Sequence, residues 1–131
     1  FFLITGNVER IGDHALNIGG YVNTMEKHNI SFSSDAKDEI AEMKRITQKA
    51  LDAVMHRDDD KTKWLSRIAA MEQQMDDMTE SYRNKHLERM RQGKCSEEAC
   101  VLYSEMLTDF ERIGDHLLNI AQSYSKMTIN I

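Results

Sequence analysis

A short acidic segment occurs twice in this chain, and its two copies decide the fold. The first copy reads Asn7-Val8-Glu9-Arg10-Ile11-Gly12-Asp13-His14-Ala15-Leu16-Asn17-Ile18, and the second reads Asp109-Phe110-Glu111-Arg112-Ile113-Gly114-Asp115-His116-Leu117-Leu118-Asn119-Ile120. Both contain Glu-Arg-Ile-Gly-Asp-His, and the copies are 111 − 9 = 102 residues apart. Six identical consecutive residues do not recur by chance in a chain of 131 residues, so the sequence holds an internal repeat.

Each copy has the residue spacing of an amphipathic helix. Its apolar residues follow the i, i+3, i+4, i+7 pattern that places side chains on one core-facing stripe. They are Val8, Ile11, Ala15 and Ile18 in the first copy, and Phe110, Ile113, Leu117 and Ile120 in the second. We therefore expect both copies to be helices that pack through these stripes.

Each copy also carries two acids four positions apart, which are neighbours on another helix face. The pairs are Glu9 with Asp13 and Glu111 with Asp115. Like charges at this spacing destabilise an isolated helix, and Gly12 and Gly114 each cost roughly 1 kcal/mol relative to Ala. Penalties kept in both copies suggest that a bound cation offsets the repulsion and that glycine allows a close approach. The alternative is a solvated acidic face on which the neighbouring arginines, Arg10 and Arg112, supply the counter-charge.

The composition indicates a soluble, globular, helical chain. Charged residues make up 30% and the hydrophobic set 40%, proline is absent, and the net charge is −5. No basic face is apparent, which argues against nucleic-acid binding, whereas the acidic balance suits a protein that binds cations. No apolar run approaches the roughly 18 residues that span a bilayer. Cys95 and Cys100 form neither a Cys-x-x-Cys pair nor a disulfide framework, and two scattered cysteines fit a reducing compartment.

Four helices are expected in one domain over residues 1–131. Their ranges are about 1–28, 34–57, 59–91 and 96–126. Ser34 or Asp35 would cap the second helix, an aspartate within 58–60 the third and Ser96 the fourth, and Gly93 is a fitting stop for the third. Because short links make consecutive helices antiparallel, the fold class is all-α, an up-down-up-down four-helix bundle.

A third acid pair, Glu72 with Asp76, lies on the third helix. It precedes the loop near residues 93–95 by about 20 residues, and Glu111/Asp115 follow that loop by about 18. In an antiparallel helix pair, equal distances from the loop mean equal heights. The spacing therefore predicts one composite site of Glu72, Asp76, Glu111 and Asp115. No such partner is apparent for the acids of the first copy.

Carboxylates from adjacent helices are hard oxygen ligands, which suit Mg, Mn, Ca or Fe ions and are poor at selecting Zn. A di-iron oxidase would need Glu-x-x-His on two helices, and no such motif occurs in the sequence. His14 and His116 follow the motif Asp, so we expect them at the helix surface, with a flanking ligand role as the alternative. No nucleophile–base arrangement or phosphate-binding glycine loop is evident. No catalytic residue or organic cofactor site is therefore predicted.

The repeated Glu-Arg-Ile-Gly-Asp-His, followed by Leu-Asn-Ile, closely resembles the signature of PhoU-like proteins, which regulate phosphate uptake. The resemblance implies two three-helix repeats, each with a Glu-x-x-x-Asp motif on its third helix. It also implies that an acid pair on the preceding helix completes a binding site for a multinuclear metal cluster. It implies iron first, with Mn, Mg, Ca and Zn as alternatives. The residues that carry over are Glu111, Asp115, Glu9, Asp13 and, from a looser pattern, Glu72 and Asp76. Residues 34–126 would form one complete repeat, and residues 1–28 the last helix of a preceding one.

The same resemblance implies a function that is regulatory and not enzymatic. The chain lacks an initial Met and has an incomplete first repeat, which fits the cytoplasmic, membrane-side part of a sodium-dependent phosphate transporter. The expected partner is the transporter's membrane domain or a phosphate sensor, and uncovered apolar surface predicts a homo-oligomer. The alternatives are a free-standing PhoU-like adaptor and a metal-dependent helical-bundle enzyme.

Overall fold

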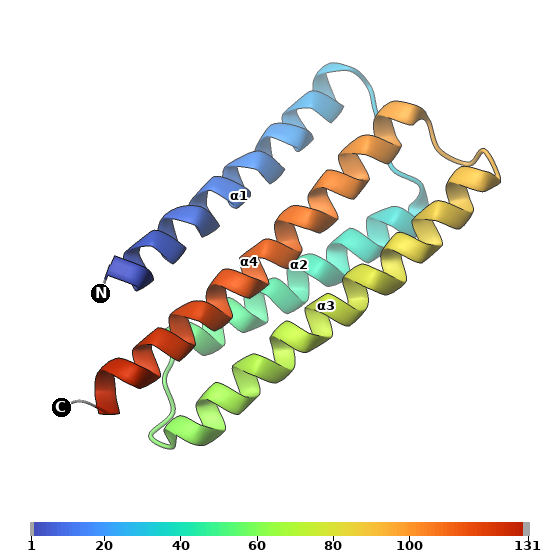
Figure 1. The fold of residues 1–131 in the computed structure, drawn as a ribbon. Helices are drawn as coiled ribbons and strands as arrows, with labels where there is room; N and C mark the ends of the chain where they lie inside the picture. The colour runs from blue at the N-terminus through green and yellow to red at the C-terminus, as the bar shows by residue number, and fades with distance from the viewer. Residues whose placement is uncertain (1, 130–131) are drawn as a thin grey trace.

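The computed structural model describes residues 2–129, with side chains up to Met127, as four antiparallel helices (Figure 1). They are α1 (Phe2–Lys27), α2 (Ser34–Met55), α3 (Lys61–Arg91) and α4 (Glu97–Ile129). The chain runs up, down, up and down the long axis, so the expected all-α up-down architecture is confirmed. Within the described range, no helix combines the length and the apolarity needed to cross a bilayer.

The helix ends follow the expected capping chemistry with small shifts. Ser33 caps α2, one residue before the expected cap, because its Oγ accepts a hydrogen bond from the Ala36 N–H at 3.2 Å. Asp60 caps α3 by accepting from the Lys63 N–H at 3.1 Å, so α3 begins at Lys61 and not at 59. Helix α2 ends at Met55, two residues early. Gly93 follows α3 with a φ of 67°, as a left-handed helix stop requires.

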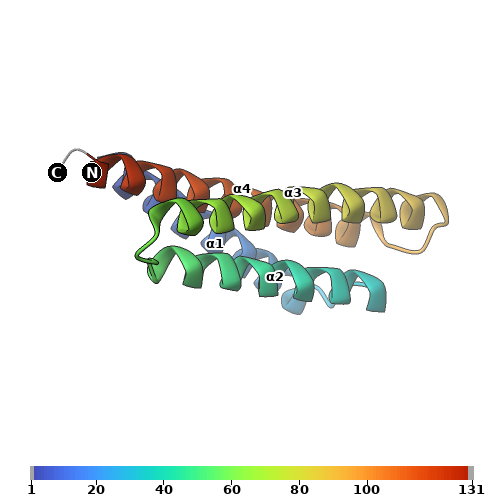
Figure 2. The same cartoon turned by 90° about the horizontal axis from the view of Figure 1, so that it is seen from below.

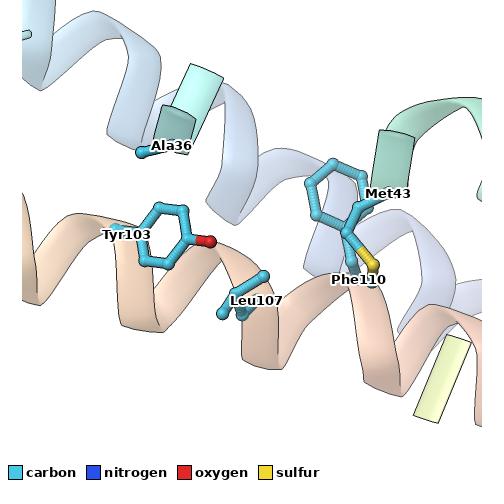
Figure 3. Packing of buried hydrophobic residues seen from close by; sticks show 5 residues of the cluster. All are labelled: Ala36, Met43, Tyr103, Leu107 and Phe110. Carbon is cyan, nitrogen blue, oxygen red and sulfur yellow. The ribbon is translucent and has the colours of Figure 1, made fainter. Parts of the chain in front are cut away.

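Helices α2, α3 and α4 form a three-helix bundle around three buried clusters (Figure 2). Figure 3 shows the first cluster, near the α3–α4 turn, where α2 and α4 interdigitate. The clusters comprise Ala36, Met43, Tyr103, Leu107 and Phe110; Ile46, Ala50, Met75, Ile113 and Leu117; and Trp64, Ile68 and Ala121. In the apolar stripe of the second repeat copy, Phe110, Ile113 and Leu117 are therefore core, as predicted, whereas Ile120 is half-buried and belongs to none of these clusters.

Helix α1 runs along α4, and its backbone approaches no other described helix. None of its residues is fully buried: Ile11 and Ile18 are half-buried, whereas Val8 is 55% exposed. The expected core role of the whole first stripe is wrong for Val8 and Ala15, because one neighbouring helix covers too narrow a face. The two repeat copies therefore share the Glu-Arg-Ile-Gly-Asp-His sequence but differ in how deeply their apolar residues are buried.

The motif glycines differ in the same way. A Cβ built on Gly114 would lie 2.9 Å from Sδ of the fully buried Met75, so glycine is what lets α3 approach α4 here. A Cβ on Gly12 would meet nothing within 4 Å. The predicted close approach is therefore confirmed for the second copy alone.

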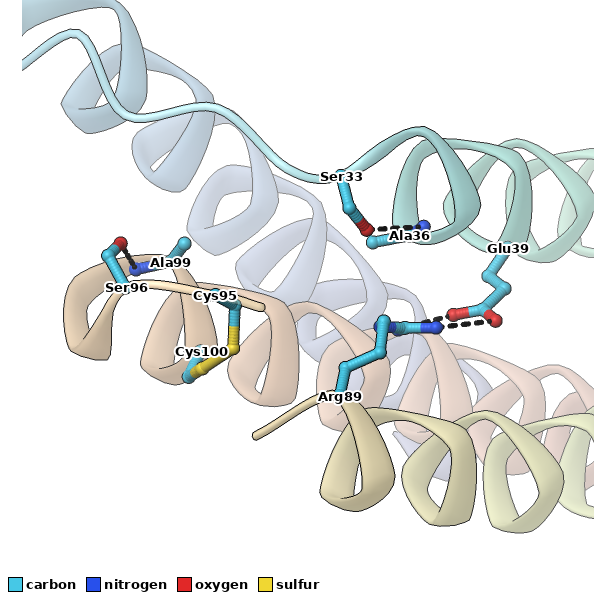
Figure 4. Close-up of a disulfide and its surroundings, with 8 residues drawn as sticks. All are labelled: Ser33, Ala36, Glu39, Arg89, Cys95, Ser96, Ala99 and Cys100. Atoms are coloured by element: carbon cyan, nitrogen blue, oxygen red, sulfur yellow. Dashed lines mark hydrogen bonds and ion pairs between the residues drawn. A yellow bond between two sulfur atoms is a disulfide. The ribbon is translucent and has the colours of Figure 1, made fainter. Parts of the chain in front are cut away.

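The two cysteines are joined, so the expectation that they form no disulfide is wrong. Cys95 and Cys100 lie on either side of Ser96, which caps α4 by accepting from the Ala99 N–H at 3.2 Å (Figure 4). They occupy the positions just before the cap and four after it, where side chains commonly pack together and fix the entry of the chain. The sequence analysis did not predict the disulfide because the two cysteines are five residues apart and lie on opposite sides of the start of α4.

A buried ion pair links α2 to α3 beside this turn (Figure 4). Both nitrogens of the Arg89 fork donate to the Glu39 carboxylate, at 2.7 and 3.0 Å. The Tyr103 hydroxyl donates to the same carboxylate. Burial alone would raise the pKa of Glu39, but Arg89 and Tyr103 outweigh it and hold the pKa below its ordinary value.

Candidate metal centre

Three carboxylates from two helices meet on one side of the α3–α4 pair. Ligand oxygens of Glu72, Asp76 and Asp115 all lie within 4.8 Å of one another. The first two are one turn apart on α3, and Asp115 reaches them from α4. Counting equal distances from the α3–α4 turn predicted this meeting, and the structure places these three acids together as expected.

Burial and neighbouring negative charge strain the ionised form of this cluster. Burial is the largest cause that raises the pKa of Glu72 to about 8, followed by hydrogen bonds to Asp76 and Asp115. A hydrogen bond between two carboxyl groups requires a proton on one of them. A shared proton of this kind is what a cation bound among these oxygens would replace.

Glu111, one turn before Asp115 on α4, is electrostatically part of the same group. Burial raises its pKa, and the charges of Asp76 and Asp115 raise it further. The positive charges of Arg83 and Arg112 act in the opposite direction but do not outweigh these causes. The fourth predicted member is thus coupled to the cluster, although its oxygens are not within the 4.8 Å group.

The arginines do not neutralise these acids by direct contact. Arg83 donates instead to the hydroxyl groups of Ser104 and Thr108, at 3.1 and 2.6 Å. Within residues 2–129, none of the four acids forms an ion pair with a lysine or arginine. Among the described residues these four acids therefore lack a directly paired counter-charge, while Asp115 is exposed to solvent and the other three acids are half-buried.

The donor chemistry of the cluster fits a hard cation. Carboxylate oxygens within ligand distance on two rigid helices are suitable for iron, manganese, magnesium or calcium. Glu72, Asp76 and Asp115 would be direct ligands, and Glu111 is placed to join them or to orient a bound water. A cation would supply positive charge in direct contact with the carboxylates, beyond the longer-range effect of Arg83 and Arg112.

The first repeat copy has no equivalent cluster in the described part of the chain. Glu9 and Asp13 are exposed on α1 and belong to no group of three ligand side chains there. The structure therefore does not bring them together with the other four acids. Together with the open space at Gly12, they form a half-site without the facing helix that completes the second copy.

The motif histidines lie in the α1–α4 interface, so the expectation that they sit at the helix surface is wrong. Nδ1 of His14 lies 2.7 Å from Oδ1 of Asp109, and Nδ1 of His116 lies 2.8 Å from Oδ1 of Asn7. The two rings stack with centroids 5.5 Å apart. A polar residue seven positions before the motif His in each copy was the sequence signal for these contacts.

The comparison with protein families covers the part of the chain that holds the clustered acids. The PhoU domain is matched over residues 40–124, well over half of the chain. The chain belongs to the PhoU family. The PhoU match includes all four acids of the clustered site and leaves Glu9 and Asp13 outside it.

A curated PhoU relative is similar over nearly the whole chain. It is the phosphate-specific transport system accessory protein PhoU homolog 1 of Thermotoga maritima, with 28% identity over 120 residues. The similarity covers 90% of this chain and 50% of the relative, so the chain spans about half the length of that protein. No match is found among solved structures.

Proposed function

We propose that this chain is a non-catalytic regulatory region that modulates phosphate uptake through a metal-bearing helical surface. The observation that carries the proposal is the convergence of Glu72, Asp76 and Asp115 within 4.8 Å in a PhoU domain. The similar Thermotoga protein is described as an accessory protein of a phosphate-specific transport system, which supports a role in phosphate transport.

The metal proposed for this surface is iron, by family resemblance, with Mn, Mg, Ca and Zn as alternatives. Its charge would replace the proton that the acids share and would fix the α3–α4 face in one arrangement. A rigid, charged face can recognise a partner, whereas four mutually repelling carboxylates cannot keep one geometry. The protein's own contribution is therefore to hold the ligands at a fixed height on two packed helices.

The proposed setting is the cytoplasmic side of the membrane, as part of a sodium-dependent phosphate transporter. The proposed partner is the transporter's membrane domain or a phosphate sensor. A free-standing PhoU-like adaptor is the alternative, and the gene's flanking sequence separates the two. Only the transporter requires several apolar segments of membrane-spanning length next to this region.

Phosphate uptake by cells that carry the full-length gene tests the regulatory role. We expect Glu72→Gln with Asp115→Asn to change the response of uptake to phosphate supply. Glu9→Gln with Asp13→Asn is the control, because it also removes one Glu and one Asp but takes them from the first repeat copy, where no cluster forms in the described residues. Uptake that is unaltered by the first pair, in protein of normal abundance, would contradict the proposal.

A further inference from the structure

A second group of ligand side chains lies at the α3–α4 turn, away from the acidic cluster. It consists of His86 on α3 and the two cysteines, and the ring nitrogen and sulfur atoms lie within 4.8 Å of one another. His86 is ten positions beyond Asp76 along α3, which separates the two groups by about 15 Å of helix. They are therefore independent sites with different donor chemistry.

The local backbone keeps the two cysteine side chains together whether or not they are bonded. Cys95 directly precedes the cap residue Ser96, and the Cys100 N–H donates to the Ser96 carbonyl at 2.9 Å to close the first turn of α4. Side chains at these two positions pack against each other across a capped helix start. After reduction, the thiols would therefore remain neighbours on a folded helix end.

The distances also allow both sulfurs to bind one metal ion. Tetrahedral zinc holds two thiolate sulfurs about 3.8 Å apart, given Zn–S bonds of about 2.3 Å. The cysteine Cα atoms are 6.2 Å apart, so side-chain rotation can open this separation without movement of the helix. A hollow of about 370 Å³ borders His86 and Cys95 and provides access for an ion and a water ligand.

The surroundings of His86 favour the neutral imidazole, which is the form that binds metal ions. The residue is buried, burial and the nearby Arg89 lower its pKa, and its ring makes a backbone hydrogen bond with Cys100. Such a hydrogen bond orients the ring of a metal-binding histidine.

We propose that reduction of the Cys95–Cys100 disulfide creates a thiolate–imidazole site, with His86 as third ligand, for Zn²⁺ or a similar thiophilic ion. A dithiol reductant supplies two electrons and two protons, so the disulfide becomes two thiols and the reductant becomes a disulfide. Zn²⁺ then binds both sulfurs, and the two thiol protons pass to solvent. In the reverse direction, a disulfide oxidant takes the two electrons of the thiolates and two protons from solvent to become a dithiol, the Cys95–Cys100 bond re-forms and the ion is released, so the turn carries either a disulfide or a metal.

The test compares reduced and oxidised chain in the Glu111→Gln/Asp115→Asn background, which disables the acidic cluster. Zn²⁺ affinity is measured by competition with a chromophoric chelator, and Co²⁺ reports the ligands through thiolate-to-cobalt absorption. We expect one Zn²⁺ per reduced chain, the thiolate band with Co²⁺, and affinity weaker by on the order of 100-fold in the oxidised chain. Cys100→Ser and His86→Gln should each weaken binding in the reduced chain.

Equal Zn²⁺ affinity in the two redox states, or a Co²⁺ spectrum without thiolate absorption, would overturn the proposal. The redox comparison needs no substitution at the turn, so a variant that fails to fold does not obscure it. The outcome is also separate from the metal role of the carboxylates, because the carboxylates are the same in the two redox states that are compared.

Discussion

Nδ1 of His14 lies 2.7 Å from Oδ1 of Asp109, although the two residues are 95 positions apart. The contact is one half of a reciprocal pair, because Asp109 is the repeat equivalent of Asn7, which contacts His116 in the same way. The two repeat copies therefore pack antiparallel about a local two-fold relationship. This pairing fixes α1 on α4 although α1 has no buried residue of its own.

Asp109→Ala should destabilise the chain by about 1–3 kcal/mol, because it leaves the half-buried His14 ring and the Asn17 amide without their shared acceptor. Asp109→Asn should cost less, since it recreates the His116–Asn7 arrangement. Urea unfolding of both variants measures the difference. Equal losses in the two variants would mean that the acceptor at this position is unimportant.

Alanine at the two motif glycines should have opposite effects. Gly12→Ala should stabilise α1 by about 0.5–1 kcal/mol, because the position is open and alanine favours helix. Gly114→Ala should destabilise by about 1 kcal/mol, since the new methyl group displaces the fully buried Met75.

A double-mutant cycle locates the cause at Met75. In the Met75→Ala background, Gly114→Ala should lose its penalty, because the opposing sulfur is gone. Stability measured by thermal unfolding decides the matter. A penalty that persists without the methionine side chain would place the close approach elsewhere.

The Glu39–Arg89 pair predicts a loss of stability in acid. The pKa of Glu39 in the folded chain is below its ordinary value of 4.5. The pair's contribution is therefore fully present above about pH 4.5 and is lost as pH falls through the lower folded-state pKa. Glu39→Gln should cost roughly 3 kcal/mol at neutral pH, because it leaves Arg89 buried without its anion.

The pH dependence of that cost is the check. Urea unfolding of wild type and Glu39→Gln from pH 7 to about pH 3 should show a difference that shrinks as the pH falls. Tyr103→Phe is the control, because it removes one hydrogen bond and leaves the charge pair. A constant difference across the range would show that the carboxylate charge is not the stabilising feature.

The exposed apolar face of α1 predicts self-association. Leu16 is 76% exposed, and Val8, about two turns before it, is 55% exposed, on a helix whose backbone approaches only α4 among the described helices. We expect sedimentation analysis to show a dimer that Leu16→Glu converts to monomer. Met55→Glu, at an equally exposed position at the end of α2, should leave the dimer intact. A wild-type monomer at micromolar concentration would contradict this expectation.

The sequence was sufficient for the features that depend on local periodicity and chain length. Helical spacing identified the stripe of α4, and equal counting from the α3–α4 turn placed Glu72 and Asp76 beside Asp115. Neither argument requires knowledge of other parts of the structure.

The features that were missed depend on how many helices surround a given one. The stripe of α1 reads as core, but Val8 is exposed because only α4 covers the helix. The disulfide was missed because Cys95 and Cys100 meet across a helix cap and not along a helix. His14 was placed at the surface because its partner, Asp109, comes from the other repeat copy.

Metal binding by the oxidised chain is the measurement that tests the central claim most directly. In the oxidised chain the cysteines are joined in a disulfide and cannot bind metal as thiolates. Elemental analysis and titrations with Fe, Mn, Mg, Ca and Zn then measure metal binding by the carboxylates. We predict binding by wild type and by Glu9→Gln/Asp13→Asn, and its loss in Glu111→Gln/Asp115→Asn. No binding above background, or equal binding by all three proteins, would contradict a metal centre at Glu72, Asp76, Glu111 and Asp115.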